Sequence, residues 1–196
     1  MEHFYQNIGE NWFSYPTLYS VMVNQNPSGS HFVEVGSWRG RSAAYMGVEI
    51  YNSGKSILFD CVDTWNGSKE HLDPNSGWFV KELTEDPDYL WKEFNRNISP
   101  VKEIIKPIRM TSLEACELYN DESLDFVFID ASHEYQDVLD DITYWIKKVK
   151  VGGVLAGHDI SYHEIQRAVG EYSLQNQISI VTHPQEDIWF YEKINK

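Results

Sequence analysis

The chain has 196 residues, 42% of them hydrophobic, which suits a single globular domain with its own core. Its 30 acidic and 16 basic residues give a formal net charge of −14, which repels phosphate backbones and anionic lipid surfaces and argues against nucleic acid as a partner. Two isolated cysteines, the lack of any apolar stretch of roughly 18 residues and the lack of a signal-like start predict a soluble cytoplasmic protein that does not bind membranes.

Short apolar runs alternate with helical patterns along most of the chain. The runs cover residues 31–35, 56–62, 103–108, 124–129 and 153–157. Their nearly continuous apolar character is typical of parallel strands buried on both faces. We therefore expect an α/β fold, a parallel sheet with helices on both faces. Two final runs, residues 178–183 and 188–194, are joined by a short link and predict an antiparallel hairpin at the sheet edge.

The clearest helix is predicted over residues 134–150, where apolar side chains recur with the helical period before Gly152 and Gly153. Residues 64–86 form a polar, turn-rich segment that contains Trp65, Trp78 and Phe79. These aromatic residues fit either a cover that closes a pocket or a small satellite core under a long loop. No repeat or linker divides the chain, so we expect one domain over residues 1–196, with a helical segment in residues 1–30.

Two glycines follow the first run, in EVGSWRGRS at residues 34–42. Gly36 and Gly40 precede a helical pattern, where backbone amides can approach a ligand; a tight turn that needs glycine torsion angles is the alternative. Asp63 ends the second run, a position from which an acid can accept hydrogen bonds from ribose hydroxyls. The glycine spacing differs from the G-x-G-x-x-G of dinucleotide binders, which disfavours a nicotinamide-dependent oxidoreductase.

Several motifs together resemble a known enzyme family. FVEVGSWRGRS, VDTWNGS, SLDFVFIDASHEYQDVLDDITYW and KVGGVLAGHDI are similar to the successive motifs of class I S-adenosylmethionine-dependent methyltransferases, over residues 32–169. The likeness is closest to the small methyltransferase-domain group related to macrolide-sugar O-methyltransferases. It implies a Rossmann-like, seven-stranded, mostly parallel sheet with a C-terminal antiparallel hairpin, S-adenosyl-L-methionine as cofactor and a small-molecule acceptor such as a sugar. The acceptor itself and the oligomeric state, including a homo-oligomer, stay open.

The resemblance also implies which residues bind the cofactor. The positions that match are Glu34, Gly36, Ser37 and Gly40 beside the methionine part, Asp63 at the ribose, Thr111 and Ser112 beside the adenine, and Asp130. Trp38 stands where the middle glycine of the common family pattern usually lies. This departure resembles the macrolide-sugar group rather than the whole superfamily.

Polar residues follow the fourth and fifth runs. Asp130 comes after the fourth, and His158 and Asp159 come after the fifth, so all three are expected at the edge where parallel strands end. Carboxylates and imidazole are donors for a divalent ion, Mg²⁺ or similar. The resemblance implies a metal-binding acid at Asp130 and an acidic pair on the fifth strand, in which His158 replaces the first acid. Both members of this pair can bind one ion only if the strand has ended there.

His133 lies three residues after Asp130, which in the resembling enzymes is the position of the proposed base. A neutral imidazole can accept the proton that an acceptor hydroxyl loses on methylation, with Asp130 as the second catalytic residue. The residues alone also allow a solvated or capping histidine in the first turn of a helix. Two other functions stay open: a non-catalytic protein that binds S-adenosylmethionine, and a metal-dependent hydrolase or hydroxylase built on Asp130, His133, His158 and Asp159.

Overall fold

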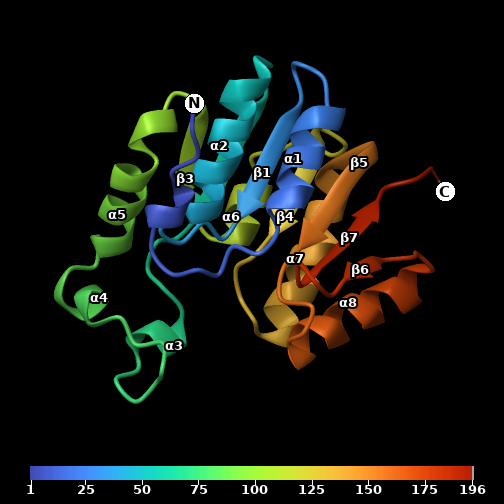
Figure 1. Ribbon diagram of the computed structural model, residues 1–196. Coiled ribbons are helices and arrows are strands. Elements are labelled where there is room, and N and C mark those ends of the chain that lie inside the picture. Colours follow the sequence, from blue (N-terminus) through green and yellow to red (C-terminus); the bar gives the residue numbers. More distant parts are fainter. Residues whose placement is uncertain (196) are drawn as a thin grey trace.

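The computed structural model describes residues 1–195 and contains one seven-stranded sheet (Figure 1). The strand order is β3-β2-β1-β4-β5-β7-β6. The strands are β1 His31–Val35, β2 Leu58–Asp63, β3 Ile105–Arg109, β4 Leu124–Ile129, β5 Val149–Gly157, β6 Val181–His183 and β7 Ile188–Glu192. The first five pair in parallel, whereas β7 runs antiparallel to both β5 and β6. The predicted Rossmann-like sheet with a C-terminal hairpin is confirmed.

Helices cover both faces of the sheet (Figure 1). They are α1 Pro16–Gln25, α2 Arg41–Ser53, α3 Lys69–Leu72, α4 Lys81–Glu85, α5 Tyr89–Asn97, α6 Ser112–Cys116, α7 Tyr135–Lys148 and α8 His163–Asn176. Helices α1, α2 and α5 share one hydrophobic core with the sheet, and α6, α7 and α8 share the other. Alternate strand residues serve the two cores: Phe126 and Phe128 of β4 face the first, and Val127 and Ile129 face the second. None of the helices described in residues 1–195 is both long and apolar enough to cross a membrane.

The helix predicted over residues 134–150 ends earlier than expected. Helix α7 stops at Lys148, and Val149 is already extended and pairs with Leu124 of β4. The two glycines expected to end the helix lie inside β5, where Gly152 donates its backbone N–H to Lys193 and Gly153 accepts one from the same residue. Pairing of Val149 with β4 therefore decides this boundary, and the glycines do not.

Residues 64–86 contain the two short helices α3 and α4 (Figure 1). Trp65 is fully buried and packs against Trp91 and Phe94 of α5, in the core shared by α1, α2 and α5. Trp78 is 52% exposed and meets Trp12 edge to face. The segment is thus anchored by one tryptophan and presents another on the surface.

Candidate functional site

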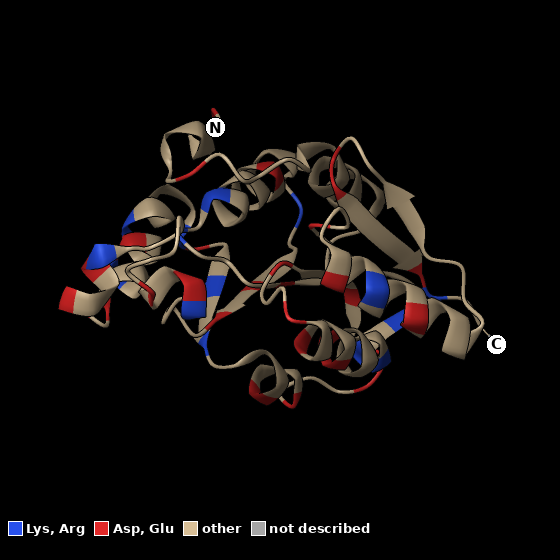
Figure 2. Cartoon of the chain, turned by 90° about the horizontal axis from the view of Figure 1, so that it is seen from below, with Lys and Arg blue, Asp and Glu red and all other residues tan. Residues whose placement is uncertain are grey.

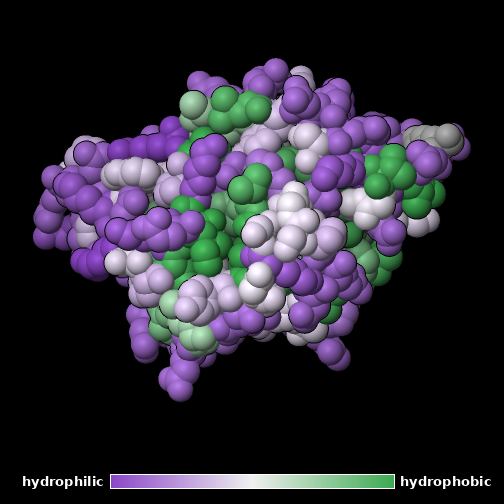
Figure 3. All heavy atoms as spheres, turned by 90° about the horizontal axis from the view of Figure 1, so that it is seen from above, coloured by the Kyte–Doolittle hydropathy of each residue, from purple (hydrophilic) through white to green (hydrophobic). Residues whose placement is uncertain are grey.

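The carboxyl ends of β1, β2, β4 and β5 meet at one edge of the sheet, which Figure 2 views from below. Backbone hydrogen bonds between neighbouring strands continue just past the strand ends: the Gly36 N–H donates to the Val62 carbonyl oxygen at 2.8 Å, and the Asp130 N–H donates to that of Val35 at 2.7 Å. Loops that carry acidic residues surround this edge (Figure 2). The opposite edge, seen in Figure 3, is largely hydrophilic with apolar side chains between, and its exposed residues include Leu58.

Gly36 allows the first loop to approach β4 closely. Its φ is 89°, and a Cβ built there would lie 1.9 Å from the carbonyl oxygen of Asp130. Gly40 also has a positive φ and caps the N-terminus of α2. The structure therefore supports both readings of these glycines: the turn needs glycine torsion angles, and it also places backbone amides at the helix N-terminus.

Asp63 organises the loop that follows β1. One carboxylate oxygen accepts the backbone N–H groups of Ser37 and Trp38, both at 2.9 Å, and the other accepts that of Trp65 at 2.7 Å. Burial raises the pKa of Asp63, and these backbone hydrogen bonds oppose the shift. The structure thus brings Ser37 and Asp63 together, with Trp38 in the left-handed region at a φ of 45°.

Glu34 is fully buried beneath this loop. The Tyr19 hydroxyl donates to it at 2.6 Å. Burial raises the pKa of Glu34 to about 7, against the lowering effect of its hydrogen bonds. A carboxyl group this far from water can hold either a proton or a charge near neutral pH.

Thr111 and Ser112 lie at the start of α6. Thr111 caps the helix by accepting the N–H of Glu114. The Ser112 hydroxyl donates to Asp141 of α7 and accepts from Trp145 Nε1. Burial raises the pKa of Asp141 to about 7. Ser112 therefore joins α6 to α7, while Thr111 is exposed at the rim.

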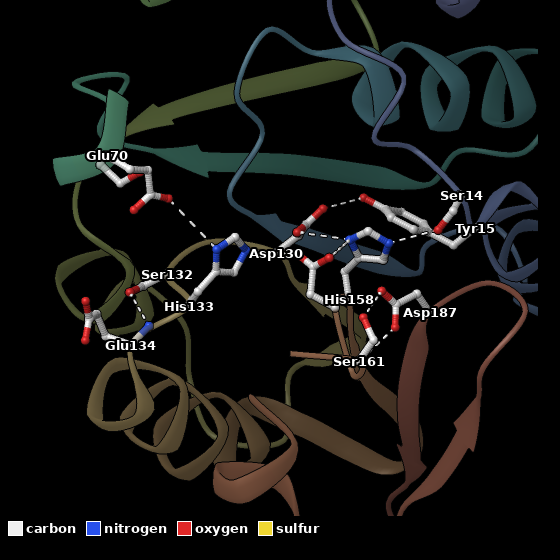
Figure 4. Close-up of polar contacts among 12 residues, drawn as sticks. Ser14, Tyr15, Glu70, Asp130, Ser132, His133, Glu134, His158, Ser161 and Asp187 are labelled. Carbon is white, nitrogen blue, oxygen red and sulfur yellow. Dashed lines mark hydrogen bonds and ion pairs between the residues drawn. The ribbon is translucent and has the colours of Figure 1, made fainter. Parts of the chain in front are cut away.

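Asp130 and His158 converge at the ends of β4 and β5 (Figure 4), and Asp159 lies close to both. His158 Nδ1 lies 3.5 Å from Asp130 Oδ1 and 3.3 Å from Asp159 Oδ1. Strand β5 ends at Gly157 and Asp159 has a φ of 58°, so both residues after the strand turn toward Asp130. Because β5 has ended before them, His158 and Asp159 can face the same ion, which two adjacent residues inside a strand could not do.

Charge dominates this cluster. Burial lowers the pKa of His158, but the carboxylates of Asp130 and Asp159 outweigh it and raise the value to about 10. Burial raises the pKa of Asp159, but the hydrogen bonds from His133 and His158 outweigh it and hold the pKa below the usual range. The two carboxylates thus favour a positive charge between them.

His133 lies beside the cluster and is 37% exposed (Figure 4). Its Nε2 is 2.9 Å from Asp159 Oδ2, its Nδ1 is 3.9 Å from Glu70 Oε1, and its ring stacks on Tyr162. The hydrogen bond to Asp159 raises the pKa of His133, and burial acts against it. Helix α7 begins after Glu134, whose N–H is accepted by Ser132, so His133 does not cap the helix.

Residues that precede α1 complete the rim and were not identified from the sequence. Tyr15 donates its hydroxyl to Asp130 Oδ2 at 2.8 Å, and Ser14 Oγ lies 2.8 Å from His158 Nε2 (Figure 4). Trp12 meets Trp38 of the glycine loop and Trp78. No periodic pattern marks these positions. A contact across more than 100 residues leaves no local signal in one sequence.

Comparison with known proteins places this geometry in context. Residues 33–160 match a family model described as a methyltransferase domain. The structure of the O-methyltransferase NovP aligns with 93% of this chain and 80% of its own at a TM-score of 0.69 and 17% identity. An O-methyltransferase from Bacillus cereus in complex with SAH aligns with 97% of this chain and 82% of its own, at a TM-score of 0.56 and 12% identity. At these identities the structural likeness shows a shared fold.

One curated relative, the uncharacterized protein y4gI of Sinorhizobium fredii, is 27% identical over 114 residues. The match covers 57% of this chain and 11% of that relative. It therefore concerns a small part of a much longer protein.

Proposed function

The chain belongs to the class I S-adenosylmethionine-dependent methyltransferases through its methyltransferase domain, and we propose that it methylates a hydroxyl of a small acceptor such as a sugar. The fold shared with two O-methyltransferases supports transfer to oxygen. The observation that carries the proposal is the His133–Asp159 pair at the ends of β4 and β5, where ligands bind in open α/β sheets.

When bound, S-adenosylmethionine would supply an electrophilic methyl group to the acceptor oxygen, with the carbon–sulfur bond broken and a neutral thioether, S-adenosylhomocysteine, as the leaving group. Asp159 accepts the Nε2–H of His133, which leaves Nδ1 with a lone pair that can take the hydroxyl proton. The negative charge of Asp159 then stabilises the imidazolium that forms. The partly exposed ring lies where an acceptor could reach it.

The cofactor is proposed to bind along the ends of β1 and β2. The glycine loop and Asp63 would hold the methionine and ribose parts, since the carboxylate already fixes the loop through the backbone N–H groups of Ser37 and Trp38. Glu34 and Asp130 are also proposed to bind the cofactor, at the same edge of the sheet. Thr111 is the better placed of the two residues assigned to the adenine, because the Ser112 hydroxyl is engaged with α7.

Asp130, His158 and Asp159 form a donor set that fits a divalent ion. One ligand atom from each lies within 4.8 Å of the other two, and the set combines carboxylate oxygen with imidazole nitrogen. When bound, such an ion would supply positive charge that polarises an acceptor hydroxyl. In the part of the chain described, residues 1–195, this is the one group found with that geometry.

Methylation assays with a panel of hydroxylated acceptors, read by mass spectrometry, test the proposal. Methyl transfer to one of them supports it, and failure of the chain to bind S-adenosylmethionine at millimolar concentration refutes it. Binding without transfer to any acceptor would favour the non-catalytic alternative. Hydrolase or hydroxylase activity that needs a metal but no S-adenosylmethionine would favour the second alternative, a metal-dependent hydrolase or hydroxylase.

A further inference from the structure

We propose that Ser14 is a positioning residue that fixes the tautomer of His158, and that the Asp130–His158–Asp159 cluster therefore selects a first-row transition ion over Mg²⁺. The inference rests on the proposed function, because it concerns the same site.

The Ser14 hydroxyl has one hydrogen and two neighbours. Its Oγ lies 2.6 Å from the backbone carbonyl oxygen of Glu186 and 2.8 Å from His158 Nε2. A carbonyl oxygen can only accept, so an oxygen–oxygen distance of 2.6 Å requires the hydroxyl hydrogen between them. Ser14 must then accept from His158, and Nε2 carries a hydrogen.

This assignment determines what Nδ1 offers. A protonated imidazole carries hydrogen on both nitrogens, whereas a metal-bound imidazole has lost the hydrogen of the nitrogen that binds the metal. Because Ser14 holds the hydrogen on Nε2, the nitrogen that can exchange its hydrogen for a metal is Nδ1, which faces Asp130 Oδ1 and Asp159 Oδ1 at 3.5 and 3.3 Å. Two carboxylate oxygens and Nδ1 therefore surround one region, which holds a proton while His158 is charged and can hold a metal ion in its place.

Each of the three donor groups has its outward atom held by a neighbour. Tyr15 donates to Asp130 Oδ2, His133 to Asp159 Oδ2, and Ser14 accepts from His158 Nε2. The inward atoms are the ones that lie close to one another. Outer partners of this kind orient metal ligands, and their loss typically lowers metal affinity roughly 10- to 100-fold.

The kind of donor atom that each ligand supplies determines which ion the site prefers. Mg²⁺ and Ca²⁺ prefer oxygen ligands, whereas imidazole nitrogen suits Fe²⁺, Ni²⁺ and Zn²⁺. Mn²⁺ is the weakest binder of the first-row series and also favours oxygen, but it accepts an imidazole ligand more readily than Mg²⁺ does. An acid at position 158 would complete an all-oxygen set. His158 instead supplies nitrogen, and Ser14 makes that nitrogen available.

Titration of the full chain with Mn²⁺, followed by electron paramagnetic resonance, tests this without cofactor or acceptor. We expect Mn²⁺ to bind and to resist displacement by Mg²⁺, and Ser14→Ala to bind it roughly 10- to 100-fold more weakly. Ser14→Thr, which keeps the hydroxyl, should restore affinity. Ser161→Ala is the matched control, because Ser161 lies in the same rim but bonds Asp187 and not His158.

Nitrogen-15 NMR of histidine in the Zn²⁺-loaded chain gives a second readout, one that a loss of stability would not reproduce. We expect Nδ1 of His158 to bind the metal and Nε2 to keep its hydrogen. Metal on Nε2, displacement of Mn²⁺ by equal Mg²⁺, or equal Mn²⁺ affinity in Ser14→Ala would each overturn the inference. S-adenosylmethionine affinity, measured separately, tests the proposed function and is expected to be unchanged in Ser14→Ala.

Discussion

Gly36→Ala should disrupt the meeting of the first loop with β4. Gly36 has a φ of 89°, and the new Cβ would lie 1.9 Å from the carbonyl oxygen and 2.5 Å from the carbonyl carbon of Asp130. Contacts below 3.0 Å essentially never occur for a real Cβ, so the two backbones must separate by about 1 Å. Backbone cannot rotate away as a flexible side chain can, and the loop and the residue after β4 must both move.

The free energy of unfolding that Gly36→Ala loses has two contributions. A left-handed conformation costs an alanine about 1–2 kcal/mol, and forced overpacking adds about 1–3 kcal/mol. Gly29→Ala separates them, because Gly29 has a φ of 91° and nothing within 4 Å of its added Cβ. We expect Gly29→Ala to lose only the first part and Gly36→Ala about 2–5 kcal/mol. For a chain of this length each kcal/mol lowers Tm by about 2–4 °C.

Denaturant unfolding gives the free energies, and isothermal titration with S-adenosylmethionine gives the functional effect. Gly36→Ala should lose affinity for the cofactor at a temperature where it is still folded, whereas Gly29→Ala should keep it. Equal stability of the two variants, or undiminished cofactor affinity in Gly36→Ala, would refute the argument that close approach to β4 requires glycine.

Three further predictions concern side chains. His133→Gln should lower methyl transfer roughly 10²- to 10⁴-fold with cofactor affinity kept, while His163→Gln, at an exposed histidine, should not; full activity in the first variant would remove the base from the mechanism. Asp141 has a folded pKa of about 7, above its usual value, so it binds more protons folded than unfolded and its contribution to stability falls as pH rises from about 4 to 7. Asp141→Asn should remove that fall, up to about 4 kcal/mol, in unfolding curves at several pH values, and identical pH profiles would contradict it. Tyr15→Phe should weaken Mn²⁺ binding by roughly 1.5–3 kcal/mol, the range for a hydrogen bond to a charged group, and an unchanged affinity would show that Asp130 needs no such support.

The sheet could be predicted because its signal is local. Each buried strand is a short apolar run, and five strands in this order with crossover helices leave few arrangements. Boundaries were less predictable: Val149 is extended because it pairs with Leu124, a residue 25 positions earlier. The burial of Trp65 was not predictable for a similar reason, since it depends on the partners of Trp65 on α5.

The candidate site also has features that the sequence could predict and features that it could not. Asp63 ends β2, Gly36 and Asp130 directly follow β1 and β4, and Asp159 lies two residues after β5, so the topology alone brings them to one edge. The sequence could therefore predict their proximity. It could not predict that Ser37 and Trp38 donate to Asp63, because those contacts depend on backbone torsions that one sequence does not reveal.

The N-terminal contacts bear on what the family match can explain. The matched residues, 33–160, include Asp130, His133, His158 and Asp159 but stop short of Ser14 and Tyr15. Yet these two hold the outward atoms of His158 and Asp130. Since metal affinity depends on such outer partners, a chain could keep every matched residue and still bind a different ion or none. Cofactor chemistry should therefore follow the family match, whereas the affinity for an ion should also depend on residues outside it.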